Sequence, residues 1–170
     1  MHQLSASQRA EGQTDQVLTR LLRRGLIVGL LIGGDQLTKW AVRTAFSPSE
    51  TLPVIPSVLH LTYVQNTGAA FGLFPGYPQA FVVLAVLVAG WIIVELTRMR
   101  PRAWPVETGL LVILGGSLGN LIDRLRFGYV VDFIDLRVWP VFNVADSAIT
   151  VGVVLMMLDV LGVGRVPETI

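Results

Sequence analysis

Long stretches without a charged residue constrain this chain more than any other feature. Residues Gln79–Val94 contain no Asp, Glu, Lys or Arg, and neither do residues Thr108–Ile122. Across the 170 residues, 52% belong to the AVILMFWYC set and only 15% are charged. A soluble domain of this size has too much surface for its volume to hide so much apolar area. The sequence therefore predicts a membrane protein and excludes a disordered chain or a nucleic-acid binder with a basic face.

Four segments are apolar enough to be expected as membrane-spanning helices, since a span needs about 20 residues, or fewer where the bilayer thins. They cover residues 22–44, 79–98, 106–123 and 144–162. The first is interrupted by Asp35, Lys39 and Arg43. The expected fold class is thus an all-α integral membrane protein with one four-helix domain over residues 22–165, preceded by a polar tail over residues 1–21.

Two longer connections separate these segments. Residues 45–78 contain five prolines and are too broken for a helix, and within them Val58–Gln65 is rich in β-branched and aromatic residues, which predicts a strand. Residues 124–143 form the second connection.

Arginines gather at the opposite ends of the spans, and the positive-inside rule then places both termini in the cytoplasm and both connections outside. These arginines are Arg20, Arg23, Arg24, Arg98, Arg100, Arg102 and Arg165.

The scarcity of Cys and His limits the kinds of catalytic and metal site that the chain can form. The chain has no Cys, and its two imidazoles are His2, in the polar tail, and His60. The absence of Cys excludes a thiolate zinc site and a cysteine nucleophile. With two His residues, one of them in the tail, a Ser-His-Asp arrangement is not expected. We expect no metal and no cofactor.

Carboxylates at span ends are the sharpest functional signal, because a charge near the bilayer centre costs at least about 2.5–3.5 kcal/mol. Asp35, Asp123, Asp132 and Asp146 all fall at the outer ends of spans or in their outer connection. Their convergence on one face of the bundle predicts a functional site. Asp135, by contrast, is interpreted as a charge solvated in a loop.

Three of these carboxylates also have structural interpretations. Asp35 and Lys39 are four residues apart, so an intrahelical ion pair explains them as well as a functional role does. Asp123 is a candidate end-cap that pins the outer connection. Asn143-x-x-Asp146 precedes an apolar run and resembles a capping box, which is compatible with a functional Asp146 because a helix start stabilises its ionised form.

Asp132 has the weakest structural explanation, since it is a lone carboxylate in the apolar run Val130–Ile134. If Asp132 folds back onto Asp146, the two can share a proton. One carboxylate then removes a proton from water while the other hydrogen-bonds the carbonyl of a scissile peptide. The expected catalytic pair is therefore Asp132 and Asp146.

Small residues have mostly packing interpretations. Gly25, Gly29 and Gly33 repeat every fourth residue, as do Gly115 and Gly119, and this spacing lets helices approach closely. The segment Asn66–Phe71 is either a turn or a place where a bound peptide comes close to the backbone, and the residues alone leave both interpretations open.

Five motifs in order resemble those of the bacterial prolipoprotein signal peptidases, also called signal peptidase II. They are DQLTK from Asp35, NTGAAF from Asn66, GNLIDR from Gly119, VVDF from Val130 and FNVADS from Phe142. Their order and spacing match over roughly residues 25–165. No single motif is specific, but five in order are.

The resemblance implies an aspartyl peptidase of the bacterial cytoplasmic membrane that cuts a prolipoprotein just before a diacylglyceryl-modified cysteine. It implies Asp132 and Asp146 as the catalytic dyad and a small extracytoplasmic β-sheet platform in the connection 45–78. The implied partners are the lipid-modified substrate, membrane lipids and globomycin-type inhibitors, with a monomeric enzyme and an active site at the outer face. Substrate contact or support of the site is implied for Asp35, Asn66, Gly68, Asn120, Arg124 and Asn143.

Two other functions compete with this interpretation. A small proton-coupled four-helix transporter would place its acid near the bilayer midplane and would tend to show repeated halves, and the sequence shows no repeat. A noncatalytic membrane scaffold would have no need for an Asp within Val130–Ile134.

Overall fold

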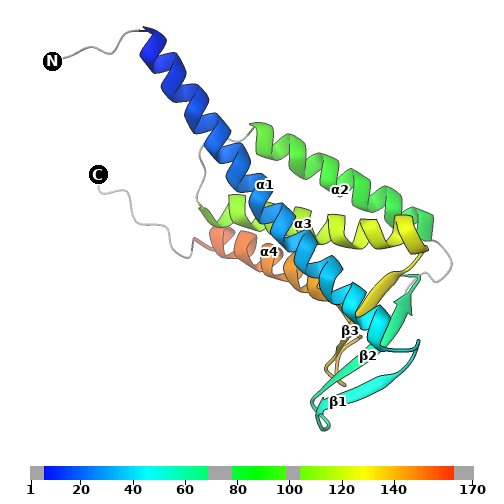
Figure 1. The fold of residues 1–170 in the computed structure, drawn as a ribbon. Coiled ribbons are helices and arrows are strands. Elements are labelled where there is room, and N and C mark those ends of the chain that lie inside the picture. The colour runs from blue at the N-terminus through cyan, green and yellow to red at the C-terminus, as the bar shows by residue number, and fades with distance from the viewer. Residues whose placement is uncertain (1–5, 69–77, 99–103, 163–170) are drawn as a thin grey trace.

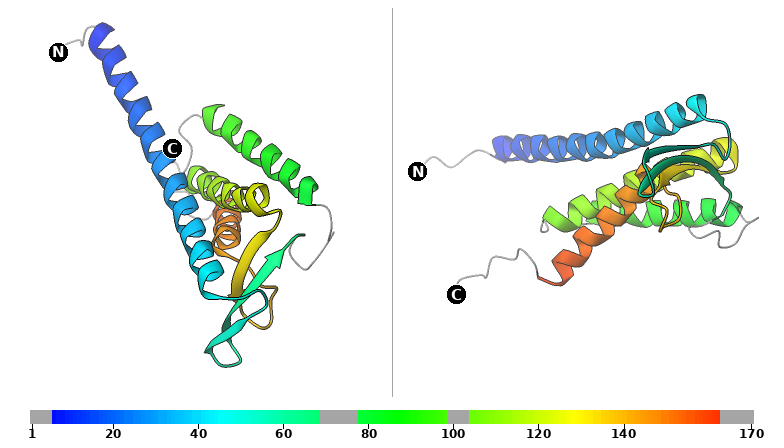
Figure 2. Two further views of the ribbon diagram at one scale, coloured as in Figure 1. Left: turned by 45° about the vertical axis from the view of Figure 1, so that its right-hand side comes forward. Right: turned by 90° about the horizontal axis from the view of Figure 1, so that it is seen from below.

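The computed structural model describes residues 6–68, 78–98 and 104–162, with four helices and three strands among them. In chain order the elements are α1 (Ala6–Ala45), β1 (Thr51–Ile55), β2 (Leu59–Asn66), α2 (Pro78–Arg98), α3 (Trp104–Phe127), β3 (Val130–Asp135) and α4 (Val144–Val160). Helix α3 is central and contacts the three other helices. The small sheet lies at one end of the bundle, where α1 and α3 end and α4 begins (Figures 1 and 2).

All four expected helices are present, but two boundaries differ from the prediction. Helix α1 begins at Ala6 rather than near residue 22, so most of the segment expected as a polar tail is helical. This segment is rich in residues of good helix propensity, such as Gln, Arg and Leu, and contains no Pro. Helix α3 continues to Phe127 and stops at Gly128, whose positive φ of 80° is typical of a residue that ends a helix.

Helices α3 and α4 approach each other through glycines. A Cβ atom on Gly116 would collide with the carbonyl oxygen of Ala145 in α4. A Cβ atom on Gly119 would lie 2.6 Å from an oxygen of Asp35 in α1, so α3 approaches α1 closely as well. Packing is therefore the confirmed role of the small residues on α3. The same prediction is wrong for Gly25, Gly29 and Gly33, because a Cβ atom at any of these three positions would have no neighbouring atom within 4 Å.

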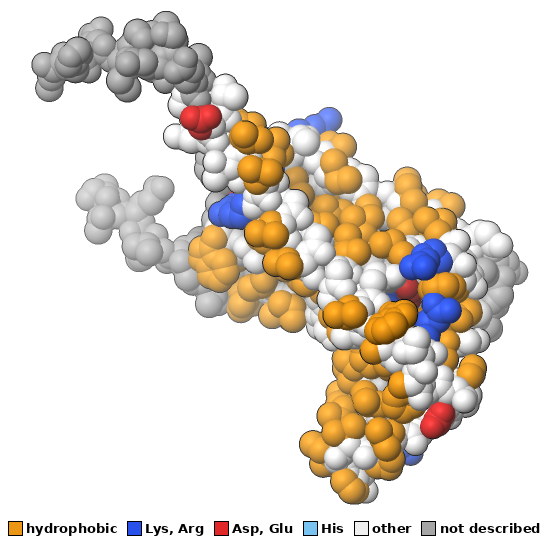
Figure 3. Space-filling view, viewed as in Figure 1, with side chains coloured by type: hydrophobic (Ala, Val, Ile, Leu, Met, Phe, Trp, Pro, Cys, Tyr) orange, Lys and Arg blue, Asp and Glu red, His pale blue; other side chains and the backbone are white. Residues whose placement is uncertain are grey.

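Apolar side chains are divided between a core and an exposed coat. Ala89, Ile92 and Leu96 of α2 pack against Leu110, Leu111 and Leu114 of α3. Other large apolar residues of α2, such as Leu87 and Trp91, are more than half exposed, and hydrophobic side chains are spread over the face seen in Figure 3. Within the described residues, two helical segments, Gln79–Arg98 and Trp104–Phe127, are long and apolar enough to cross a membrane.

The sheet is antiparallel, in the order β1-β2-β3. The strand expected over Val58–Gln65 is confirmed as β2, whereas β1 and β3 were not predicted as strands. Tyr63 of β2 and Val131 and Phe133 of β3 pack on Val42 of α1. Side chains alternate across a strand, so this packing directs Asp132 to the opposite face of the sheet.

Candidate active site

A cleft of about 260 Å³ lies where the sheet meets the helical bundle. It receives Asp132 from β3 and Asp146 from the first turn of α4, so the two carboxylates that were expected to converge line the same space. Of the other residues implied for the site, Asn66, Gly68, Asn120 and Arg124 also line the cleft. Asp35 and Asn143 do not line the cleft. Asn143 donates to Asp132, and Asp35 accepts from the backbone at the start of α4.

The Asp132 carboxylate is only 2% exposed and is held by two amide groups. Asn66 donates to its Oδ2 at 2.9 Å, and Asn143 donates to its Oδ1 at 2.6 Å. Burial, followed by the negative charge of Asp146, raises the pKa of Asp132 to about 7. Asp132 is therefore protonated over much of the neutral and acidic range.

The Asp146 carboxylate lies in a different environment, at the start of a helix. The capping box expected from Asn143-x-x-Asp146 is confirmed: Asn143 Oδ1 accepts from the Asp146 backbone at 2.9 Å, and Asp146 Oδ2 accepts from the Asn143 backbone at 3.2 Å. Asn120 donates to Asp146 Oδ1 at 2.7 Å. These hydrogen bonds hold the Asp146 carboxylate at the first turn of α4.

Asn143 connects the two carboxyl groups. Its side chain is fully buried, and its amide nitrogen donates both to Asp132 and, at 3.1 Å, to Asn120 Oδ1. Because Asn120 in turn donates to Asp146, the two carboxylates belong to one continuous hydrogen-bonded chain. This chain fixes where each carboxylate points.

A buried lysine, Lys39, binds residues of α1 and α3 next to the cleft. Lys39 is 2% exposed, and its Nζ lies 2.9 Å from Asp35 Oδ2 and 3.0 Å from Asp123 Oδ2, while it also donates to Asn120 at 2.9 Å. The ion pair considered for Asp35 and Lys39 is thus present. It forms part of a larger network that the sequence did not reveal.

Both partners of Lys39 also bind backbone at the start of an element. Asp35 Oδ1 accepts from the Ala145 backbone at 3.0 Å, which holds the beginning of α4. Asp123 Oδ2 accepts from the Val131 backbone at 3.0 Å, which holds the beginning of β3 and agrees with its interpretation as a pin for the outer connection. These two bonds position the segments that carry Asp146 and Asp132.

The segment after β2 forms a turn at the edge of the cleft. The Gly68 backbone donates to Asn66 Oδ1 at 3.0 Å, and the Gly68 carbonyl accepts from Arg124 Nη2 at 3.2 Å. The turn interpretation holds for residues 66–68, while residues 69–71 of the motif lie outside the described residues. Arg124 Nε is buried and has no partner among the described residues.

The interpretation of Asp135 as a solvated loop charge is wrong. Asp135 ends β3, is 5% exposed, and pairs with Arg137 at 3.1 Å and with the hydroxyl of Thr62 at 2.8 Å. Burial works against its charged form, but the donors from Arg137 and Thr62 hold the pKa of Asp135 below its usual value. It went unrecognised because β3 itself was not predicted.

Sequence reasoning also missed two parts of the site. Gln36 donates to Asp123 at 2.9 Å and to the Gly119 carbonyl at 3.2 Å, joining α1 to α3. The apolar segment 139–142, which begins with the half-exposed Trp139, forms one wall of the cleft. The uncharged run Val138–Phe142, which lies between Arg137 and Asn143, was the available signal.

The chemistry that this arrangement supports is acid and base catalysis. Two carboxyl groups share a cleft, one buried with a raised pKa and one at a helix start. Among the described residues, no three His, Asp or Glu side chains are grouped so that they could hold a metal ion.

Comparisons with known proteins identify the family of this chain. The family described as signal peptidase (SPase) II matches residues 27–162. The lipoprotein signal peptidase of Moorella thermoacetica is 53% identical over 136 residues, covering 80% of this chain and 91% of that protein. That of Halothermothrix orenii is 47% identical over 134 residues, covering 78% of this chain and 91% of that protein.

Two solved structures of bacterial membrane enzymes share the fold. One, obtained by the in meso method at 2.3 Å resolution, has a TM-score of 0.79 and 28% identity and covers 87% of this chain and 94% of its own. The other, at 1.9 Å, has a TM-score of 0.75 and 30% identity, with 86% and 94% covered. The family match and the shared fold together define a bacterial membrane enzyme of the peptidase class. The chain belongs to the signal peptidase II family, the lipoprotein signal peptidases.

Proposed function

We propose that this chain is an aspartyl endopeptidase that removes signal peptides from diacylglyceryl-modified prolipoproteins, cutting before the lipidated cysteine. The observation that carries the proposal is the pairing of Asp132 and Asp146 in one cleft with unlike environments. Membership of the signal peptidase II family supports the substrate class. The cleft would also be where globomycin-type inhibitors bind.

In the proposed mechanism Asp146 is the general base. As an ionised carboxylate it takes a proton from a water molecule, whose oxygen attacks the scissile carbonyl carbon. Asp132, protonated, donates a hydrogen bond and then its proton to the carbonyl oxygen, which gives a neutral tetrahedral diol. The proton on Asp146 then passes to the leaving nitrogen, the C–N bond breaks, and a diol proton returns to Asp132. Both carboxyl groups end in their starting states.

Membrane placement completes the proposal. Helices α1 and α4 are proposed to cross the bilayer together with α2 and α3 as a monomer, and both termini are proposed to face the cytoplasm. Lys39 pairs with both Asp35 and Asp123 within the bundle, which lowers the cost of carrying these charges in α1 and α3. Helix α4 has 17 residues, or about 25 Å at 1.5 Å per residue, which a locally thinned bilayer accommodates. The cleft and the sheet then lie at the outer face.

The substrate class is tested with a pair of prolipoproteins. One carries diacylglyceryl on its cysteine, and the other has the same sequence without the lipid. The purified enzyme in lipid is expected to cut the first just before the cysteine, as read by mass spectrometry, and to leave the second intact. Equal cleavage of both, or cleavage at another bond, would contradict the proposed specificity. Proton uptake into vesicles with no cleavage would favour a transporter instead.

A further inference from the structure

Two arginines at the sheet end of the bundle share one aromatic ring. The guanidinium carbon of Arg43, in the last turn of α1, lies 3.8 Å from the centroid of Phe127, and that of Arg126 lies 5.1 Å from it. Both arginines are exposed. Within the described parts of the chain, neither guanidinium has a carboxylate within 4.0 Å. Two cations therefore lie close together without an acidic partner.

Nearby groups do not balance this charge. Asp123 lies one helical turn before Phe127, but its carboxylate is bound by Lys39, Gln36 and the Val131 backbone. Tyr129 packs beside Phe127 with a ring separation of 5.8 Å, and its hydroxyl already accepts from Gln65. Like charges held side by side repel each other, so an anion at this position would stabilise the arrangement.

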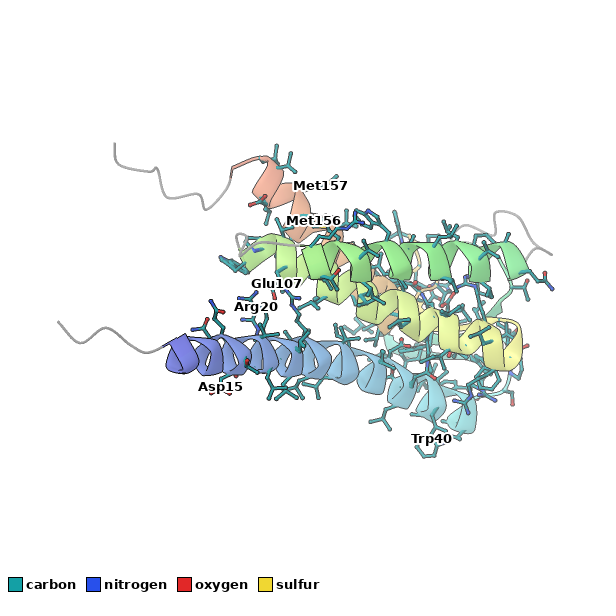
Figure 4. The ribbon with its side chains drawn as sticks, turned by 90° about the horizontal axis from the view of Figure 1, so that it is seen from above. Asp15, Arg20, Trp40, Glu107, Met156 and Met157 are labelled. Carbon is teal, nitrogen blue, oxygen red and sulfur yellow. The ribbon has the colours of Figure 1, made fainter. Side chains whose placement is uncertain are left out.

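The position of the pair indicates which anion it meets. Trp40, one turn before Arg43 on α1, is 62% exposed and points away from the bundle (Figure 4). Leu125, next to Arg126, is 67% exposed. Tryptophan side chains gather at the level of lipid headgroups, and arginine forks match the geometry of phosphate. Figure 3 shows basic side chains near the end of α3, with hydrophobic side chains beside them.

We propose that Arg43 and Arg126, oriented by Phe127, bind the phosphate of an anionic phospholipid in the outer leaflet. The inference rests on the membrane placement proposed above but concerns a site apart from the carboxylate cleft, whose walls include none of these three residues. The lipid joins the outer ends of α1 and α3. These helices carry Lys39 and Asn120, so the headgroup supports the scaffold beneath the cleft.

Native mass spectrometry of the protein in neutral detergent tests this site, with phosphatidylglycerol and phosphatidylcholine of identical chains as probes. Each of Arg43→Gln and Arg126→Gln is expected to weaken phosphatidylglycerol binding about fivefold, since one basic residue near a lipid surface contributes about that factor. Phosphatidylcholine binding is expected to be weaker and unchanged. Arg43→Lys keeps the charge and is expected to fall between Arg43→Gln and the wild type.

Arg137→Gln is the matched control, because it also removes one outer arginine but from a side chain already paired with Asp135. It is expected to leave phosphatidylglycerol binding unchanged. Affinities within twofold of wild type for both Arg43→Gln and Arg126→Gln, or an equal loss in Arg137→Gln, would overturn the site. Displacement of the lipid by an equal concentration of inorganic phosphate would overturn its assignment to a lipid. Reporters fused at residues 50 and 102 test the membrane placement separately, since they are expected outside and inside.

Discussion

Asn143 donates to Asp132 at 2.6 Å while its own side-chain oxygen caps the helix whose first turn carries Asp146. One buried amide therefore sets the geometry of one carboxylate through its nitrogen and of the other through its oxygen. Asn143 and Asp132 are 11 residues apart in the chain, so this bond also closes the loop that follows β3.

The two roles of Asn143 can be separated by substitution. Asn143→Ala loses both the cap and the donor, so we expect about 1 kcal/mol lower stability and a large fall in kcat. Asn143→Ser keeps a capping oxygen but has no amide to reach Asp132. We expect it to unfold near the wild-type temperature and yet to lose about 100-fold in kcat. Wild-type turnover by Asn143→Ser would show that the bond to Asp132 has no part in catalysis.

The pKa of Asp132 predicts how activity depends on pH. With a pKa of about 7, Asp132 holds its proton below pH 7 and loses it above, where it can no longer donate to the carbonyl oxygen. We expect kcat/KM to fall about tenfold per pH unit above that point. A profile measured from pH 5.5 to pH 9 checks this, and an activity that stays level up to pH 9 is incompatible with Asp132 as the acid.

Substitution of Asn66 provides a second test of the pKa of Asp132. Its hydrogen bond favours the ionised form of Asp132, so its removal raises the pKa of that carboxyl further. Asn66→Leu removes the donor without opening space for water, and we expect the alkaline limb of the pH profile to move to higher pH. The position of the limb is the readout, since the amplitude also changes if substrate binding weakens. A limb that moves to lower pH would contradict the role given to this bond.

Lys39 is expected to be the main electrostatic support of the scaffold. Lys39→Met leaves the buried carboxylates of Asp35 and Asp123 without their shared cation, which we expect to cost about 3–5 kcal/mol of unfolding free energy. The pair of Arg137 and Asp135 provides a control, since the Arg137 side chain is half exposed, and Arg137→Gln should cost about 1 kcal/mol or less. Thermal unfolding in detergent compares the two variants, and an equal loss in both would contradict the assignment.

The contact between α3 and α4 is tested with two glycine substitutions. Gly116→Ala would drive a methyl group into the Ala145 carbonyl, so we expect a loss of about 1–3 kcal/mol and a displaced Asp146. Gly29→Ala places the same methyl group in open space on α1 and should be neutral or stabilising by up to about 1 kcal/mol. If the two variants unfold alike, the close approach of these helices is not needed for stability.

Sequence patterns predicted the elements that depend on local chemistry. Apolar segments of about 20 residues predicted all four helices, and the Asn143–Asp146 spacing predicted the start of α4. Strand β3 was missed because its pairing with β2 joins residues far apart in the chain, and Asp135 was misjudged with it. The convergence of Asp132 and Asp146 was expected from their predicted positions near the same ends of the spans. The structure confirms the convergence, since both residues line one cleft.

Other features depend on tertiary packing that no local pattern records. Lys39 was recognised only as a partner of Asp35, since its contacts with Asp123 and Asn120 require α1 and α3 to be docked. The glycine repeats on α1 and α3 look alike in sequence, but only those on α3 meet a neighbouring helix. Spacing indicates that a helix face can be packed closely, and the fold decides whether it is.

Cleavage of a diacylglyceryl-modified prolipoprotein by Asp132→Asn and Asp146→Asn, each purified and checked for wild-type unfolding temperature, tests the central claim most directly. The two substitutions remove the proposed acid and the proposed base while keeping the size of each side chain. We predict that either variant loses about 10²–10⁴-fold or more in kcat and still binds the substrate. Wild-type turnover by either folded variant would contradict the dyad.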